Sequence, residues 1–121
     1  MKRILIIDDN QDDQLISKKF LAAAGYQEFM FSDTGEDGVD KAKSEIPDLV
    51  ITDTLLPGID GFEVCRQVRD ALGDKVRIIM MTGSVDAVDA VKARRMGTDD
   101  YVVKSKNSVY LLDAVKRLMR I

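Results

Sequence analysis

Histidine and tryptophan are absent from this 121-residue sequence, and Cys65 is its only cysteine. Without histidine the chain cannot build a Ser-His-Asp or Cys-His centre or a histidine-ligated zinc site, and it cannot carry a phosphohistidine. One cysteine rules out an internal disulfide and is typical of a reducing compartment. No apolar run approaches the roughly 20 residues that span a bilayer, and the first run, residues 4–7, is too short for a signal peptide. We therefore expect a cytoplasmic protein without membrane insertion.

The charge is weakly acidic overall and unevenly distributed. A net charge of −3 and a pI of about 4.9 argue against direct binding to nucleic acid. Residues 1–84 carry 16 acidic and 10 basic side chains, whereas residues 85–121 carry 5 acidic and 8 basic ones. The difference would arise if both halves simply had ordinary solvated surfaces. It would also arise if the C-terminal half faced a binding partner.

Short apolar runs alternate with amphipathic stretches five times along the chain. Such alternation with short loops predicts an α/β fold in which a parallel sheet has right-handed crossovers and helices on both faces. Residues 1–121 are expected to form one domain with no linker or repeat. The predicted strands are residues 3–7, 28–31, 49–52, 76–81 and 101–103, and the predicted helices are residues 11–24, 35–44, 61–72, 85–96 and 108–119.

Helix boundaries are marked by residues with known capping preferences. Asn10, Thr34 and Asp60 stand where N-caps are expected, and Ser84 is the best cap for the fourth helix. Gly25 is expected to end the first helix in a left-handed conformation. The expected buried face of the first helix is Leu15, Ile16, Phe20, Leu21 and Ala23.

Polar side chains follow four of the five predicted strands. Asp8 and Asp9 follow the first strand, Asp53 ends the third, Thr82 follows the fourth and Lys104 follows the fifth. Because parallel strands end at the same edge of a sheet, and ligands bind there in open α/β sheets, these groups are expected to converge. One acid after one strand is commonplace, but the joint pattern is the strongest signal in the sequence.

This set of groups suits the transfer of a phosphoryl group. Three neighbouring carboxylates repel one another unless a cation joins them, and hard oxygen ligands favour Mg²⁺. Lys104 supplies a further positive charge. Phosphoryl transfer depends on positioning and charge neutralisation more than on a general base, which agrees with the lack of histidine. Asp53 at the strand end is the expected nucleophile, forming an acyl phosphate.

With these motifs together, the chain resembles the receiver domains of bacterial two-component response regulators, and is similar to the single-domain chemotaxis regulators. The resemblance rests on residues 7–9 (IDD), Asp53 with residues 56–61 (LPGIDG), residues 81–83 (MTG) and residues 101–104 (YVVK). It covers essentially the whole chain. It implies a flavodoxin-like (βα)5 three-layer sandwich with the strand order 2-1-3-4-5.

The resemblance also implies roles for the residues at the sheet edge. Asp53 resembles the phosphoacceptor, which takes its phosphoryl group from a sensor histidine kinase or a phosphotransfer protein. Asp9, Asp53 and the backbone carbonyl of Leu55 resemble the Mg²⁺ ligands, with Asp8 acting mainly through water. Lys104 resembles the residue that pairs with a phosphoryl oxygen. The chain would not be an enzyme beyond its own phosphorylation and autodephosphorylation.

A switch and an output surface are implied in the same way. Thr82 resembles the hydroxyl that follows the phosphoryl group, and Tyr101 resembles the aromatic residue that moves between exposed and buried positions. The face made by the fourth helix, the fifth strand and the fifth helix would bind an output protein of unknown identity. The protein would be a monomer or a phosphorylation-dependent dimer. One departure is Ser105, which stands where the family usually has a cis proline, so we expect a trans bond after Lys104.

Other interpretations remain open from the sequence. Asp8 and Asp9 could serve only the positive end of the first helix, Thr82 could be a cap, Lys104 could be a surface lysine and Tyr101 could be static. A flavodoxin-like FMN carrier shares the topology but would need a hydroxyl-rich loop after the first strand. An aspartyl phosphatase would need an Asp-x-Asp pair there. A pseudo-receiver that works without phosphorylation is the closest rival.

Overall fold

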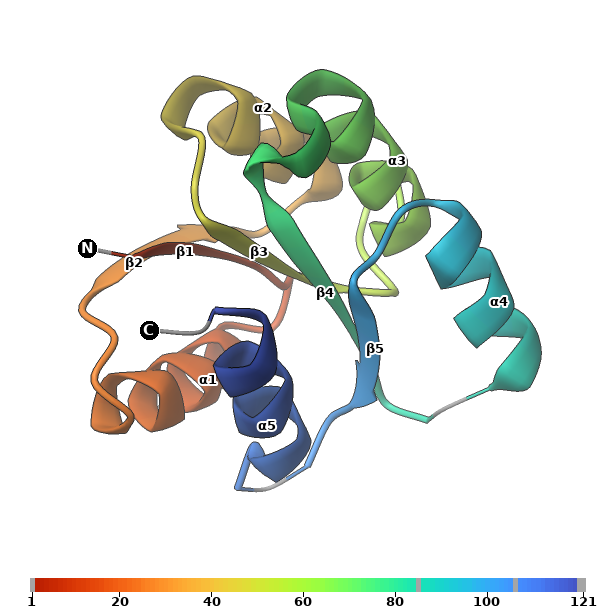
Figure 1. Cartoon of the computed structure of the whole chain (residues 1–121). Helices are drawn as coiled ribbons and strands as arrows, with labels where there is room; N and C mark the ends of the chain where they lie inside the picture. Colours follow the sequence, from red (N-terminus) through yellow and green to blue (C-terminus); the bar gives the residue numbers. More distant parts are fainter. Residues whose placement is uncertain (1, 85, 106, 120–121) are drawn as a thin grey trace.

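The structure is a computed structural model that describes residues 2–84, 86–105 and 107–119. Five strands form one parallel sheet in the order β2-β1-β3-β4-β5, which confirms the predicted fold (Figure 1). The strands are β1 (Arg3–Ile7), β2 (Glu28–Ser32), β3 (Leu49–Asp53), β4 (Arg77–Thr82) and β5 (Asp100–Val103). The helices are α1 (Gln11–Ala23), α2 (Gly35–Glu45), α3 (Gly61–Leu72), α4 (Ala87–Arg95) and α5 (Val109–Leu118), and a short 3-10 helix, η1 (Gly73–Lys75), follows α3.

Two apolar cores lie on opposite faces of the sheet, because successive strand side chains alternate between the faces. Leu5 and Ile7 point to the face covered by α2, α3 and the buried Ala93 of α4. Ile4 and Ile6 point to the face covered by α1 and α5. Figure 1 shows the same division into three layers. The sheet is thus buried on both sides, and its strand ends have a fixed position relative to one another.

Helix α1 departs from the predicted burial. Leu15 is 60% exposed and Ile16 is also exposed, whereas Gln14, Ser17 and Leu21 face inward. The physical reason is that the Gln14 side chain donates hydrogen bonds to the backbone carbonyl oxygens of Asp8, which follows β1 (2.6 Å), and of Ser32, the last residue of β2 (3.3 Å). The hydrogen bonds of Gln14 to buried carbonyl groups therefore decided which face of α1 turns inward, against the apolar periodicity of the sequence. Of the predicted stripe, Leu21 is buried, Phe20 is half-buried and Ala23 is exposed.

The helix caps agree with the sequence at three of four sites. Asn10, Thr34 and Asp60 accept hydrogen bonds from the first turns of α1, α2 and α3, and Gly25 has a φ of 107°. At α4 the prediction of Ser84 was wrong, because the Asp86 carboxylate accepts from the N–H groups of residues 88 and 89. The predicted start of this helix, Val85, lies outside the described residues.

The connection from β3 to α3 requires a glycine. A Cβ atom on Gly61 would lie 2.1 Å from the backbone oxygen of Asp53, and the Gly61 N–H donates to the carbonyl oxygen of Thr54 at 2.9 Å. The start of α3 therefore contacts the end of β3 backbone to backbone. This contact fixes the backbone of Asp53 and thereby the position from which its carboxylate projects. Within the described residues, none of the helices combines the length and apolar character needed to cross a membrane.

Replacing Gly61 with alanine should destabilise the fold by about 1–3 kcal/mol, because the added methyl group overlaps a backbone atom that cannot rotate away. Gly83→Ala is the matched control, since an added Cβ there meets no atom within 4 Å. Urea unfolding of both variants measures the difference. Equal free energies of unfolding for the two variants would contradict the requirement for glycine at position 61.

Candidate functional site

The predicted polar groups lie at the carboxyl edge of the sheet. Asp8 follows β1, Asp53 is the last residue of β3, Thr82 is the last residue of β4 and Lys104 follows β5. The ends of β4 and β5 are tied together, because the Lys104 N–H donates to the Thr82 carbonyl oxygen at 2.7 Å. The Lys104–Ser105 peptide bond is trans, as predicted. The convergence expected from strand order is therefore present.

Lys104 is the centre of this cluster. Its Nζ atom lies 3.0 Å from Asp8 Oδ2, 3.2 Å from Asp53 Oδ2 and 2.9 Å from Asp13 Oδ2. An ammonium group has three N–H donors, and each of them has a carboxylate partner here. One cation therefore holds together an acid that follows β1, the last residue of β3 and an acid in the first turn of α1.

Backbone N–H groups orient the remaining oxygens of the two strand-end acids. Asp8 Oδ1 accepts from the Asn10 N–H at 3.0 Å, and Asp53 Oδ1 accepts from the Thr54 N–H at 2.9 Å. Thr54 is itself held by its hydroxyl, which donates to the Met81 carbonyl oxygen at 2.9 Å. The carboxylates of Asp8 and Asp53 are thus fixed before any ligand binds.

Burial raises the pKa of Asp8 and of Asp53. The Asp8 side chain is 0% exposed and that of Asp53 is 14% exposed. In both acids, desolvation of the charged form is the largest effect, and it exceeds the opposing attraction of Lys104. The negative charges at this edge are therefore costly in the protein alone.

The pKa of Lys104 moves in the direction that keeps it charged. Burial by itself would lower this pKa, but hydrogen bonds to Asp13 and Asp8 and the charges of Asp53 and Asp8 outweigh burial and raise it. The side chain is 25% exposed. Lys104 is therefore a permanent cation at neutral pH.

A metal ion would fit the same edge. Asp8, Asp9 and Asp53 each offer a carboxylate oxygen, and these oxygens all lie within 4.8 Å of one another. The donor set is all oxygen and strongly anionic, which suits Mg²⁺. Asp9 is exposed, so the cluster has an open side. Leu55, whose carbonyl is the fourth predicted ligand, has a side chain that is 78% exposed, and the role of its carbonyl stays a prediction.

The two predicted switch residues lie in different surroundings, Thr82 at the end of β4 and Tyr101 near the start of β5. The Thr82 hydroxyl donates to the carbonyl oxygen of Ser84 at 3.0 Å, so it bonds within its own loop. Tyr101 packs against the core beneath α4, and its hydroxyl is buried without a hydrogen-bond partner among the described residues. An unpaired buried hydroxyl costs free energy, which makes this position of Tyr101 easier to leave.

Asp13 and Gln14 belong to the site but were missed as site residues. Asp13 lies in the first turn of α1 and reaches Lys104 at the sheet edge. Gln14 supports the loops after β1 and β2, and its amide also donates to Asp33 Oδ1 at 2.9 Å. Both residues lie on the first turn of α1, but only their tertiary contacts reveal their roles: Asp13 with Lys104, and Gln14 with Ser32 and Asp33.

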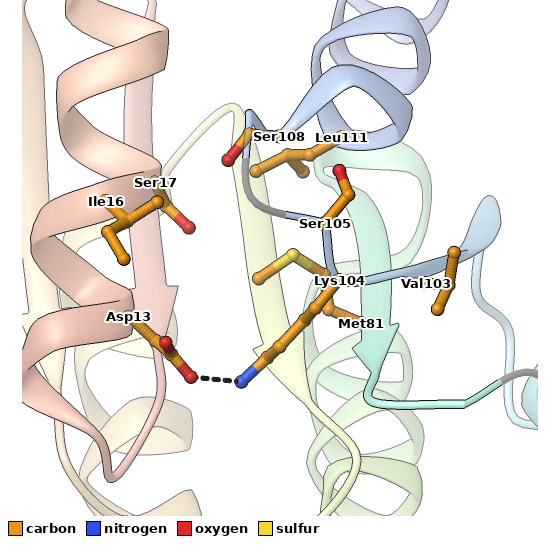
Figure 2. A pocket seen from close by; sticks show the side chains of 9 residues that line it. All are labelled: Asp13, Ile16, Ser17, Met81, Val103, Lys104, Ser105, Ser108 and Leu111. Carbon is orange, nitrogen blue, oxygen red and sulfur yellow. Dashed lines mark hydrogen bonds and ion pairs between the residues drawn. The ribbon is translucent and has the colours of Figure 1, made fainter.

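A cavity of about 270 Å³ adjoins the Asp13–Lys104 pair (Figure 2). It lies between α1 and the loop that leads from β5 into α5. Its walls combine apolar side chains with serine hydroxyl groups, and are formed by Asp13, Ile16, Ser17, Met81, Val103, Lys104, Ser105, Ser108 and Leu111. The Asp13 side chain, which is 36% exposed, faces this cavity as well as Lys104.

Cys65 takes no part in the site. It is fully buried on the inner face of α3, and its thiol donates to the Met96 carbonyl oxygen at 3.2 Å. Burial raises the pKa of this thiol to about 12, so it stays protonated.

Comparisons with known proteins place these observations in a family. Residues 4–116 match the family described as "Response regulator receiver domain". The transcriptional regulatory protein AfsQ1 of Streptomyces coelicolor is 35% identical over 120 residues, which are 99% of this chain and 52% of that protein. The alkaline phosphatase synthesis transcriptional regulatory protein PhoP of Bacillus subtilis is also 35% identical, over 98% of this chain and 49% of that protein. The chain thus spans about half the length of these relatives.

Solved structures agree with the match. A response regulator receiver domain protein (CheY-like) from Methanospirillum hungatei superposes with a TM-score of 0.87 at 31% identity. The alignment covers 98% of this chain and 94% of that one. The similarity therefore extends over the whole sheet and both helical layers.

The raised pKa of Asp53 predicts that its charge destabilises the metal-free protein. Since the folded state binds this proton more tightly than the unfolded state, stability falls as the pH rises from about 4 through the raised pKa. In the presence of EDTA at pH 7, Asp53→Asn should therefore unfold at a higher urea concentration than the unsubstituted protein. The difference should shrink as the pH is lowered to about 4. A less stable Asp53→Asn variant at pH 7 would contradict this assignment of the cost to burial.

Proposed function

Because the chain belongs to the response regulator receiver domain family of two-component signalling, we propose that it is a phosphorylation-controlled module in which Asp53 is the phosphoacceptor. The donor would be the phosphohistidine of a sensor histidine kinase or of a phosphotransfer protein. The observation that carries the proposal is the contact of Asp53 Oδ2 with Lys104 Nζ at 3.2 Å, within a cluster of three carboxylates. The grouping of Asp8, Asp53, Thr82 and Lys104 at one sheet edge supports this proposal.

The chain's own residues account for most of the proposed reaction. An oxygen of the Asp53 carboxylate forms the new bond to phosphorus, while the bond from phosphorus to the donor nitrogen breaks and that nitrogen keeps the electron pair. No proton has to be removed from the nucleophile, so no general base is required. The Thr54 N–H holds one Asp53 oxygen in place. Lys104 stabilises negative charge on the phosphoryl oxygens.

Asp8, Asp9 and Asp53 would hold Mg²⁺, with the Leu55 carbonyl as a further ligand and with Asp8 acting mainly through water. When bound, the ion would neutralise charge on the phosphoryl group and on the acids themselves. Support comes from the spacing of the three carboxylates and from the raised pKa values of Asp8 and Asp53. These costly charges are relieved by a divalent cation.

The proposed output runs through Thr82 and Tyr101 to the surface of α4, β5 and α5. Thr82 would exchange its bond to Ser84 for one to the phosphoryl group. Tyr101, whose hydroxyl has no partner among the described residues, would then move out of its buried position. The proposed output surface carries exposed apolar residues on α4, namely Val88 and Val91. It also carries the basic last turns of both helices. An output protein with an acidic, partly apolar contact face would suit it.

The proposal treats residues 1–121 as one receiver domain whose chemistry is limited to gaining and losing its own phosphoryl group. The buried free thiol of Cys65 is consistent with a reducing compartment, so we propose the cytoplasm. A monomer and a phosphorylation-dependent dimer are both compatible with the proposed function.

Incubation with Mg²⁺ and acetyl phosphate should add one phosphoryl group of about 80 Da per chain, read by intact-protein mass spectrometry. Asp53→Asn should abolish the added mass, because the amide is not a nucleophile for this transfer. Asp60→Asn is the control, because it replaces an acid in the following loop and should still be phosphorylated. A thermal melt of this variant checks that α3 keeps its N-cap. Phosphorylation that persists in Asp53→Asn would refute the assignment.

Asp9→Ala should weaken Mg²⁺ binding by at least about tenfold, because it removes one of three converging carboxylates. Asp12→Ala is the matched control, since Asp12 is a nearby exposed acid outside the cluster. Isothermal titration calorimetry measures both affinities. If Asp9→Ala and Asp12→Ala bind Mg²⁺ equally well, the metal site lies elsewhere.

A further inference from the structure

We propose that Asp13 is the counter-ion that a phosphoryl group displaces from Lys104, and that Asp13 thereby restrains phosphorylation of Asp53. This inference rests on the proposed function of Asp53. It assigns to Asp13 a positioning role that acts through Lys104, beyond its place at the start of α1.

The argument begins with the number of donors on Lys104. All three N–H groups of its ammonium have carboxylate partners, in Asp8, Asp13 and Asp53. A phosphoryl oxygen can gain a hydrogen bond from Lys104 only when one of these partners gives up its own. The incoming group therefore competes with an acid that is already bound.

Asp13 is the partner that is released at the lowest cost. Its side chain is 36% exposed, against 0% for Asp8 and 14% for Asp53. A buried carboxylate that loses its partner stays desolvated, whereas an exposed one is rehydrated. Asp13 also borders the cavity of about 270 Å³, which gives its freed carboxylate room for water (Figure 2).

Asp13 also differs from the other two partners in its place at the site. Asp8 and Asp53 belong to the group of acids that could hold a metal ion, and Asp13 does not. A cation bound by that group would hold Asp8 and Asp53 in place next to Lys104, whereas Asp13 is linked to the cluster through its 2.9 Å contact with Lys104. Asp13 is therefore the partner that can leave Lys104 without disturbing the metal ligands.

The test uses beryllofluoride, a stable mimic of the phosphoryl group, at saturating Mg²⁺. Asp13→Asn removes the charge but keeps the side-chain shape, and the backbone N–H of residue 13 can still donate to Asn10 Oδ1. This variant should bind beryllofluoride about three- to tenfold more tightly, the range expected from the loss of one partly exposed charge-assisted contact. Phosphorylation by acetyl phosphate should be faster by a similar factor.

Two further variants separate this role from a general effect of charge or helix stability. Asp12→Asn makes the same charge change one residue earlier, at an exposed position on the same helical turn, and should leave the affinity unchanged. Asp13→Glu keeps a carboxylate within reach of Lys104 and should restore the affinity to near that of the unsubstituted protein. Thermal melts of all three variants serve to check that they fold.

The outcomes are distinct from those that test the proposed function. If Asp13→Asn binds beryllofluoride with the same or lower affinity, or if Asp12→Asn shows the same gain, the role of Asp13 is refuted. The phosphoacceptor proposal would stand in that case, provided that the unsubstituted protein is phosphorylated at Asp53. If the unsubstituted protein takes up neither acetyl phosphate nor beryllofluoride, both proposals fail.

Discussion

One ammonium group surrounded by carboxylates is the constraint on which this site depends. Lys104 contacts Asp8, Asp13 and Asp53 at 2.9–3.2 Å, and with Asp9 nearby the acids outnumber the cation. The surplus negative charge is buried enough to raise the pKa of two of them. Such a cluster persists only because the surrounding fold holds the acids together. Further positive charge would lower the electrostatic cost of holding them there.

The fold imposes the cluster through its apolar strands and one tight backbone contact. Residues 4–7 of β1 are fully buried between the two helical layers, so the residues that follow have little freedom to move away from the edge. At β3 the approach of Gly61 to the Asp53 backbone has the same effect. The free energy of burying these strands offsets the electrostatic cost at their ends, which is a common balance between stability and function.

Helix α1 shows how the site shapes its surroundings. Its inward face carries Gln14 and Ser17 where apolar periodicity predicted Leu15 and Ile16. The Gln14 amide donates to the backbone carbonyl oxygens of Asp8 and Ser32, at the ends of β1 and β2. The same turn brings Asp13 to Lys104. Local hydrophobic pattern could not predict these contacts, because they join polar groups, and Ser32 and Lys104 lie 18 and 91 positions away from their partners in the sequence.

The sequence alone determined the five strand-helix units, most of the helix caps and the residues that end the strands, because these depend on local periodicity and on capping chemistry. It also predicted that Asp8, Asp9, Asp53, Thr82 and Lys104 share one edge, since parallel strands leave no alternative. Only the tertiary structure decided which of the side chains at that edge contact one another. The link from Asp13 to Lys104 joins residues 91 positions apart, and such a contact depends on where the fold brings the start of α1 relative to the residue that follows β5.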